Sequence, residues 1–141
     1  MLHVHTSITI AATASEVRSA YLQYDNWPQI FPETIIAVKL LKADQRQTEI
    51  EVLHRRAGKV LNIVTPVSNN EIRLEEFKPM YHAVFVNTFI PADHGCCYRI
   101  EGHIELKGLY RIFQPFIRKM VKDRMTRSVL LPVKEYTEHL P

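Results

Sequence analysis

The stretch from Val17 to Pro32, VRSAYLQYDNWPQIFP, decides how the first part of this chain folds. It begins in a helical pattern, for which Ser15 is the expected N-cap. The apolar face of that helix consists of Val17, Ala20, Tyr21 and Tyr24. The only tryptophan, Trp27, then stands beside Pro28, where a helix must break before the next apolar turn. We therefore expect two short helices in this region.

Trp27 itself has two interpretations. A tryptophan beside a proline, between two helical turns, commonly fills the edge of a hydrophobic core. In the alternative, its ring forms part of the wall of a ligand cavity. The sequence leaves both interpretations open.

The composition is that of an ordinary globular protein. The chain has 141 residues, of which 46% are hydrophobic and 23% charged, so residues 1–141 fit one domain with a substantial core. No apolar run approaches the roughly 20 residues needed to cross a bilayer, and no basic segment precedes the first hydrophobic residues. The two cysteines, Cys96 and Cys97, are adjacent and supply no disulfide framework. We therefore expect a cytoplasmic protein without a signal peptide or membrane span.

Much of the remaining chain has the pattern of β-strands. From Leu2 to Ile10 apolar and polar residues alternate, which is the period of a strand with one buried face. Later runs of strand-like sequence are joined by short connections that contain Gly, Pro, Asn or Asp, as between antiparallel neighbours. These runs are residues 34–42, 47–56, 59–67, 71–78, 82–91 and 96–107. We therefore expect an antiparallel meander that follows the first strand.

The C-terminal part changes to a helical period. From Leu109 onward apolar residues recur every three or four positions, while basic residues occupy the other side. Pro132 lies inside this pattern and leaves the carbonyl group of Ser128 without its usual partner. We expect one long amphipathic helix with a kink or break near Pro132.

Three features together resemble the START-like (SRPBCC) superfamily, and in particular its polyketide cyclase/dehydrase and lipid-transport branch. They are residues 14–17 (ASEV), residues 24–28 (YDNWP) and the long C-terminal helix. The resemblance implies an α+β, helix-grip fold of the START-like or Bet v 1-like kind. In that fold a curved antiparallel seven-stranded sheet wraps around the C-terminal helix, with two short helices after the first strand. A cavity between sheet and helix would then bind a lipid, polyketide or other hydrophobic molecule.

A few polar residues share strand faces with apolar ones and are candidates to point into such a cavity. His54 is suited to move a proton on a bound ketone or enol, with Tyr98 donating a hydrogen bond to the developing oxyanion. In the alternative interpretation, His54 is solvated at a hairpin end and Tyr98 fills core volume. Asn87 and Asn62 are further candidates to bond a ligand, although the parity of their strands is ambiguous.

No cofactor or metal is expected. His3 and His5 share a strand face, but no Asp, Glu or Cys follows at ligand spacing. The side chains of Cys96 and Cys97 point to opposite sides of a strand, so both thiols do not readily grip one ion. A glycine loop of the phosphate-binding kind is also missing from the sequence.

We expect the protein to bind a small hydrophobic ligand. The expected ligand-binding residues are Trp27, Phe31, His54, Asn87, Tyr98, Phe113, Phe116, Ile117 and Met120. One alternative is a cyclase or dehydrase in which His54 or Tyr98 is catalytic.

The other alternative is a module that docks on an acidic partner or a membrane surface through the basic side of the C-terminal helix. Arg111, Arg118 and Lys122 line up on that side at spacings of seven and four. A solvated helix face is the simpler explanation of this alignment. Nucleic acid is not an expected partner, because no aromatic residues are interleaved with the basic ones.

Overall fold

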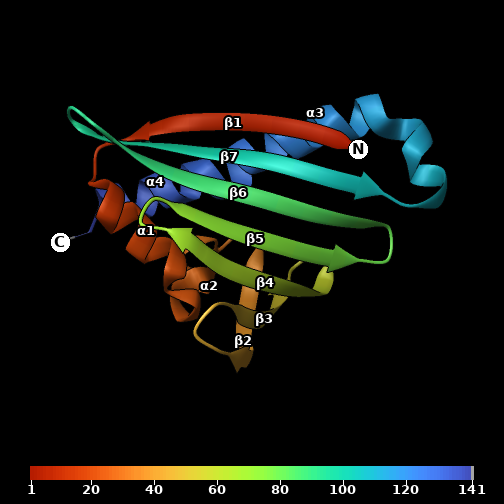
Figure 1. Cartoon of the computed structure of the whole chain (residues 1–141), viewed down its shortest axis with the longest axis horizontal. Coiled ribbons are helices and arrows are strands. Elements are labelled where there is room, and N and C mark those ends of the chain that lie inside the picture. Colours follow the sequence, from red (N-terminus) through yellow and green to blue (C-terminus); the bar gives the residue numbers. More distant parts are fainter. Residues whose placement is uncertain (141) are drawn as a thin grey trace.

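The computed structural model describes residues 1–140, and its main element is a seven-stranded sheet (Figure 1). The strands are β1 (Leu2–Ile10), β2 (Ile35–Ala43), β3 (Thr48–His54), β4 (Gly58–Ser68), β5 (Glu71–Lys78), β6 (Tyr81–Ala92) and β7 (Gly95–Leu106). Each lies close to the run expected from the sequence, because alternation marks β1 and the short polar connections mark the ends of the other strands. The expected α+β fold class is confirmed.

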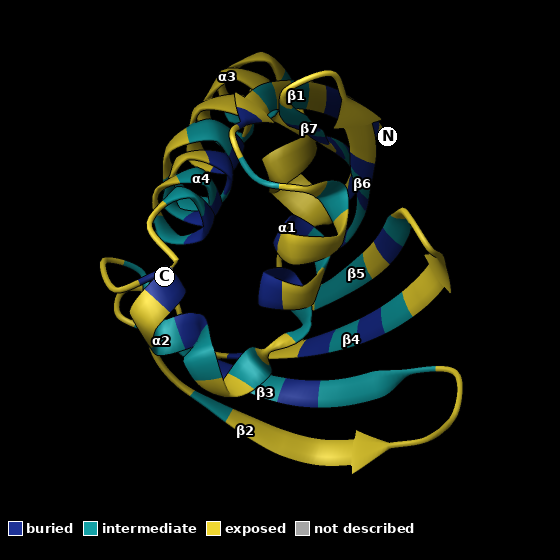
Figure 2. Cartoon of the chain, turned by 90° about the vertical axis from the view of Figure 1, so that its left-hand side faces the viewer, coloured by how far each residue is buried: buried dark blue, intermediate teal, exposed yellow. Residues whose placement is uncertain are grey.

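The strands follow the order β1-β7-β6-β5-β4-β3-β2, and all neighbouring strands are antiparallel. Each strand from β2 to β7 therefore lies beside the next one along the chain, while β1 closes the far edge against β7. The sheet is strongly curved, and the helices lie on its concave side (Figure 2). The concave, inner face is thus the one that any enclosed site would use.

Two short helices connect β1 to β2, as expected: α1 (Ala14–Leu22) and α2 (Trp27–Ile30), with a 3-10 turn, η1 (Tyr24–Asn26), between them. The predicted N-cap, Ser15, is wrong. The cap is Thr13, whose side-chain oxygen accepts a hydrogen bond from the backbone N–H of Glu16 at 3.1 Å. Thr13 is the last extended residue, with φ -67° and ψ 153°, so Ser15 already lies within the first helical turn.

Trp27 is part of the core. Its side chain is 4% exposed, and its Nε1 donates a hydrogen bond to the carbonyl oxygen of Tyr21 at 2.8 Å. The ring of Phe31, itself 5% exposed, packs edge-on against Trp27 at a centroid distance of 5.8 Å. Because the indole N–H is satisfied inside the protein, the whole ring is accommodated as core volume.

The C-terminal segment consists of η2 (Gly108–Phe113), α3 (Gln114–Met125), η3 (Thr126–Leu130) and α4 (Leu131–Glu138). The expected α-helix from Leu109 onward begins instead as the 3-10 segment η2. Pro115 has no N–H to donate to the carbonyl group of Arg111, so α-helical bonding starts only around Pro115, at the first turn of α3.

The expected irregularity near Pro132 is confirmed. The preceding segment η3 is a π-helical turn, in which the N–H of Leu131 bonds the carbonyl oxygen of Thr126, five residues earlier. Pro132 follows directly, at the first turn of α4, where its missing donor is tolerated.

The two halves of the C-terminal segment pack differently. Met125, Leu130 and Val133 are buried. Met125 lies over Gly102 of β7, where an added Cβ would come within 3.4 Å of the Met125 sulfur. By contrast, Phe116 in the first half is 79% exposed. The core therefore lies beneath α1, α2, α4 and the last turn of α3.

Candidate functional site

A group of polar side chains lies on the inner face of the sheet. Asn62 of β4 is directly opposite Glu76 of β5, and Lys78 of β5 is opposite Tyr81 of β6. Asn62 is 2% exposed, and the other three are half-buried. Cross-strand partners, and residues two apart on one strand, share a face of the sheet. These four residues thus form one group, which we call the inner polar cluster.

The closest contact within the inner polar cluster joins Tyr81 to Glu76, with Tyr81 Oη donating to Glu76 Oε2 at 2.9 Å. Burial raises the pKa of the Glu76 carboxyl, and it outweighs the hydrogen bond from Tyr81 and the charges of Lys78 and Arg124, which lower it. Burial and the neighbouring Glu76 raise the pKa of Tyr81 as well. The cluster therefore offers a carboxyl group that holds its proton more tightly than usual beside a phenol that stays protonated.

His54 lies at the end of β3, half-buried and on the same strand face as the buried Ile50 and Val52. Burial lowers the pKa of its imidazole, and the charges of Lys78 and Arg124 lower it further. Lys78 Nζ donates a hydrogen bond to the carbonyl oxygen of Ala57 at 3.0 Å, in the turn that follows His54, so Lys78 connects the inner polar cluster to this end of β3. At neutral pH its imidazole is uncharged and has a lone pair that accepts a hydrogen bond or a proton.

An apolar stripe on the C-terminal segment faces this part of the sheet. Phe113, Ile117, Met120 and Arg124 recur at spacings of four, three and four, which places them on one helical face. Ile117 is partly buried and packs against the hydrophobic core, so this face is turned toward the sheet. Phe113 and Met120 are 54% and 53% exposed. We call Phe113, Ile117 and Met120 the α3 stripe, and solvent reaches it.

Tyr98 and Asn87 lie elsewhere, in the centre of the core. Tyr98 Oη donates to Asn87 Oδ1 at 2.6 Å, and Asn87 Nδ2 lies 3.3 Å from Tyr21 Oη, which accepts its hydrogen bond. Tyr98 is 0% exposed and Asn87 1%. Burial raises the pKa of Tyr98 well above its ordinary value. The polar groups of both residues are therefore used within the protein, away from the solvent that reaches the α3 stripe.

The structure brings some of the expected ligand-binding residues together and separates others. Phe113, Ile117 and Met120 share one helical face, as the α3 stripe. Trp27 and Phe31 are packed in the core beneath α1 and α2. Phe116, at 79% exposed, is the most solvent-accessible of the set.

Sequence reasoning missed Glu76, Lys78, Tyr81 and Arg124. A usable signal existed for Glu76, because it continues the inward alternation of β5 that starts at the buried Ile72. A carboxylate on an apolar strand face is unusual enough to mark a site. Arg124 carried no such signal, since basic residues are common along this helix.

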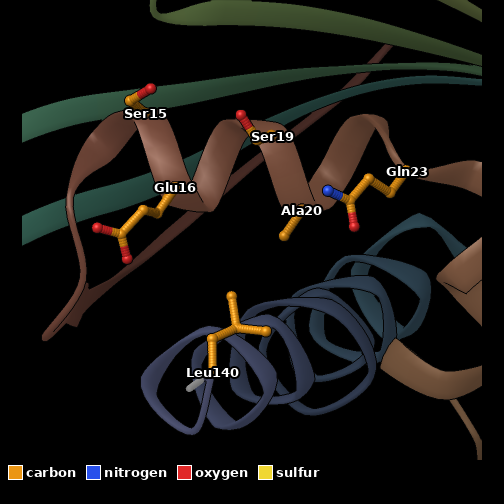
Figure 3. Close-up of a pocket in the computed structure, with 6 residues that line it drawn as sticks. All are labelled: Ser15, Glu16, Ser19, Ala20, Gln23 and Leu140. Carbon is orange, nitrogen blue, oxygen red and sulfur yellow. The ribbon is translucent and has the colours of Figure 1, made fainter.

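Two hollows of the surface lie away from the inner polar cluster. One, of about 280 Å³, separates α1 from the end of the chain (Figure 3). It is lined by Ser15, Glu16, Ser19, Ala20, Gln23 and Leu140. The other, of about 350 Å³, lies between η1 and the strands β2 and β3. Neither is lined by a residue that the sequence analysis nominated for ligand binding.

Neither a metal nor a reactive thiol emerges from the side chains that the structure describes. Within residues 1–140, no three His, Cys, Asp or Glu residues are grouped to hold a metal ion. Cys96 and Cys97 are free, and burial raises the pKa of the Cys96 thiol to about 11. Such a thiol is almost entirely protonated at neutral pH and is a poor nucleophile. No helix in the same range is long and apolar enough to cross a membrane.

Comparison with known proteins finds similarity in structure rather than in sequence. No protein-family model matches the sequence, and no curated protein is significantly similar to it. Among solved structures, the di-domain aromatase/cyclase StfQ from the steffimycin biosynthetic pathway has a TM-score of 0.81 at 11% identity. The match covers 97% of this chain and 50% of StfQ, so the chain spans about half the length of that protein.

Two single-unit structures match over nearly their whole length. The ZhuI aromatase/cyclase from Streptomyces sp. R1128 has a TM-score of 0.77 at 17% identity, covering 96% of this chain and 93% of ZhuI. A START superfamily protein from Mycobacterium smegmatis has a TM-score of 0.76 at 16% identity, covering 99% of both chains. With its curved seven-stranded sheet and long C-terminal helix, this chain has the helix-grip fold of the START-like proteins.

Proposed function

We propose that this protein binds a small hydrophobic ligand between the α3 stripe and the inner face of the sheet. The observation that carries the proposal is the exposure of Phe113 and Met120 on the helical face that is turned toward the sheet. Apolar side chains left in water on an inward-directed face gain stability when an apolar molecule covers them, at about 25 cal/mol per Å² of area buried. Such a combination of apolar lining and a few polar groups is typical of ligand sites.

The inner polar cluster gives the ligand its orientation. Tyr81 and Glu76 offer a paired hydroxyl and carboxyl group, and Lys78 adds a cation on the same face. A ligand with an apolar body and a carbonyl or hydroxyl group at one end fits both halves of the space. Lipids and polyketides have this chemistry, and the polyketide aromatase/cyclases StfQ and ZhuI share the fold.

The test is a titration with the neutral fluorescent probe N-phenyl-1-naphthylamine. Met120→Ser and Phe113→Ser are each expected to weaken probe binding about tenfold, because each removes a large apolar contact. The matched control is Leu41→Ser on the edge strand β2, where Leu41 is 45% exposed and lines neither of the two surface hollows. Native mass spectrometry of freshly purified protein, compared with its denatured mass, then identifies any ligand that co-purifies.

Saturable probe binding that is lost in the α3-stripe variants and kept in Leu41→Ser supports the proposal. Equal binding by all three variants overturns it, because the ligand would then lie elsewhere. A circular dichroism spectrum of each variant shows whether the fold is kept.

A second candidate function is acid–base catalysis on a bound ketone, as in a cyclase or dehydrase. The observation that favours it is the neutral imidazole of His54 beside the Tyr81–Glu76 pair. In this mechanism His54 accepts a proton from the carbon next to a ligand carbonyl. Tyr81 turns its hydroxyl from Glu76 to the ligand oxygen and donates a hydrogen bond there as charge develops. The enolate carbon then attacks a second carbonyl carbon of the ligand and closes the ring, and the alkoxide formed at that carbonyl takes the proton from His54.

Mutation separates this candidate from simple binding. With a poly-β-ketone as substrate, His54→Gln is expected to abolish turnover and to leave probe affinity within about twofold of the unmodified protein. His94→Gln is the matched control, because His94 is exposed in the turn between β6 and β7 and its substitution should leave turnover unchanged. Turnover that survives in His54→Gln contradicts the catalytic role.

A further inference from the structure

The segment before α3 presents large apolar side chains to solvent at one end of the molecule. Leu109 and Ile112 of η2 and Phe116 of α3 are 77%, 73% and 79% exposed. Residues three apart in a 3-10 helix lie one above the other, and Phe116 follows Ile112 by one further helical turn. These three residues therefore form a continuous apolar ridge, which we call the η2 ridge.

The η2 ridge projects from the body of the protein. Figure 1 shows η2 beyond the end of β7, at the end of the sheet where β5 turns into β6. A backbone hydrogen bond from Lys107 to the carbonyl oxygen of Met80, at 3.0 Å, joins η2 to that turn. Met80 is itself 41% exposed and extends the apolar surface. The η2 ridge can therefore contact a flat surface without interference from the rest of the protein.

Every charged residue in the chain segment that carries the η2 ridge is basic. Between Leu106 and Lys122 the sequence contains no Asp or Glu. The basic residues in this interval are Lys107, Arg111, Arg118, Lys119 and Lys122. None of them belongs to an ion pair found within residues 1–140. Arg111 and Arg118 donate only to backbone carbonyl oxygens, of Leu106 at 3.2 Å and His3 at 2.8 Å, so their charges are not neutralised.

These observations favour one kind of binding partner for the η2 ridge over another. A second copy of the chain, placed on the same ridge, would bring two sets of unpaired cations together, which is unfavourable. An anionic lipid surface matches both properties, because apolar side chains enter the boundary of the acyl chains while Lys and Arg contact the headgroups. We propose that the η2 ridge docks this protein on the surface of an anionic membrane. The α3 stripe is a separate set of residues, so docking can be tested independently of ligand binding.

The test is co-sedimentation of the full chain with lipid vesicles. Vesicles of phosphatidylcholine mixed with phosphatidylglycerol are compared with vesicles of phosphatidylcholine alone. We expect binding to the anionic vesicles at low ionic strength, and a steep fall of binding as salt is added. The double variant Ile112→Ser with Phe116→Ser should bind at least about tenfold less, since it removes most of the apolar contact.

Charge reversal tests the electrostatic attraction between the basic residues and the anionic lipid. Lys119→Glu is expected to weaken binding to anionic vesicles by more than about fivefold, because it replaces an attraction by a repulsion. The matched controls are Leu40→Ser and Lys42→Glu on β2, both of exposed residues on a different surface, and both should bind like the unmodified protein. All positions are exposed, so thermal unfolding should be nearly unchanged in every variant.

Absence of binding to anionic vesicles at low ionic strength overturns the proposal. Equal binding to neutral vesicles, or equal weakening by the β2 controls, overturns it too. If light scattering detects a dimer that Phe116→Ser disrupts, and vesicles do not bind, the ridge is an interface between copies of this chain instead.

Discussion

Aromatic and polar side chains are buried at one end of the molecule and accessible to solvent at the other. At one end, Phe89 stacks on Tyr98 at a centroid distance of 4.8 Å, and both are 0% exposed. At the other end, Phe113 and Phe116 are 54% and 79% exposed. The same residue types build a closed core under α1 and α4 and an open surface along η2 and α3.

The polar groups of the two ends also differ in how far they are buried. Within the core, the hydroxyl of Tyr98 is bonded to Asn87. In the inner polar cluster, Tyr81 and Glu76 also bond to each other, yet both remain half-buried and accessible. A fully buried network whose hydrogen bonds are all satisfied stabilises one structure. Polar groups at the edge of solvent can still form a hydrogen bond to a ligand. The difference locates the candidate site at the open end.

The largest expected effect compares the same substitution at both ends. Phe89→Ala should lower the free energy of unfolding by about 3–5 kcal/mol, because it removes a fully buried ring and leaves a cavity. Phe116→Ala should change it by less than about 0.5 kcal/mol, since its ring is 79% exposed. Chemical denaturation followed by tryptophan fluorescence measures both. A large loss of stability in Phe116→Ala would mean that α3 packs on the sheet more closely than described.

The next effect concerns the core network. Tyr98→Phe removes the hydroxyl that donates to Asn87 Oδ1 and leaves that buried acceptor without its closest partner. We expect a loss of about 1–3 kcal/mol in the free energy of unfolding. Binding of N-phenyl-1-naphthylamine should be unchanged in the folded variant. A variant that keeps its stability but loses probe binding would place Tyr98 in the ligand site.

These comparisons show why the fold was predictable from the sequence. Alternation with a period of two identified β1, and short connections with Gly, Pro, Asn or Asp separated the other six strand-like runs from one another. Pro132 marked the irregular turn η3, because the absence of its N–H has a fixed consequence. Ser15 failed as a cap because two neighbouring residues of similar type, Thr13 and Ser15, compete for that position.

The site was less predictable, for a different physical reason. Periodicity states which residues share a face but not how far a helix lies from the sheet. The inward parity of Tyr98 and the helical face of Phe113 were both readable, yet one residue lies in a packed core and the other in solvent. The distance between helix and sheet decides which residue is buried. That distance depends on where small residues of the sheet, such as Gly102, let a helical side chain such as Met125 pack closely.

A third prediction uses the raised pKa of Glu76. Because burial raises this pKa above its ordinary value of 4.5, the folded state binds the proton more tightly than the unfolded state. Stability from this group is therefore fully present below pH 4.5 and is lost as pH rises through the raised pKa. Glu76→Gln keeps an acceptor for Tyr81 and removes the titration. Urea denaturation across this pH range should show a smaller decline of the unfolding free energy for the variant than for the unmodified protein. An identical pH dependence in both would contradict a raised pKa of the Glu76 carboxyl.

The smallest expected effect has the opposite sign and belongs to His54. Its pKa is lowered from 6.5, chiefly by burial, so the unfolded state binds the proton more tightly than the folded state. Stability from this group therefore rises with pH through the lowered pKa and is fully present above pH 6.5. His54→Gln should remove that rise. The difference in unfolding free energy between this variant and the unmodified protein isolates His54 from Glu76, whose effect runs the other way. A ligand that covers the inner polar cluster should deepen the burial of His54 and strengthen the rise, whereas a ligand bound elsewhere should leave it unchanged.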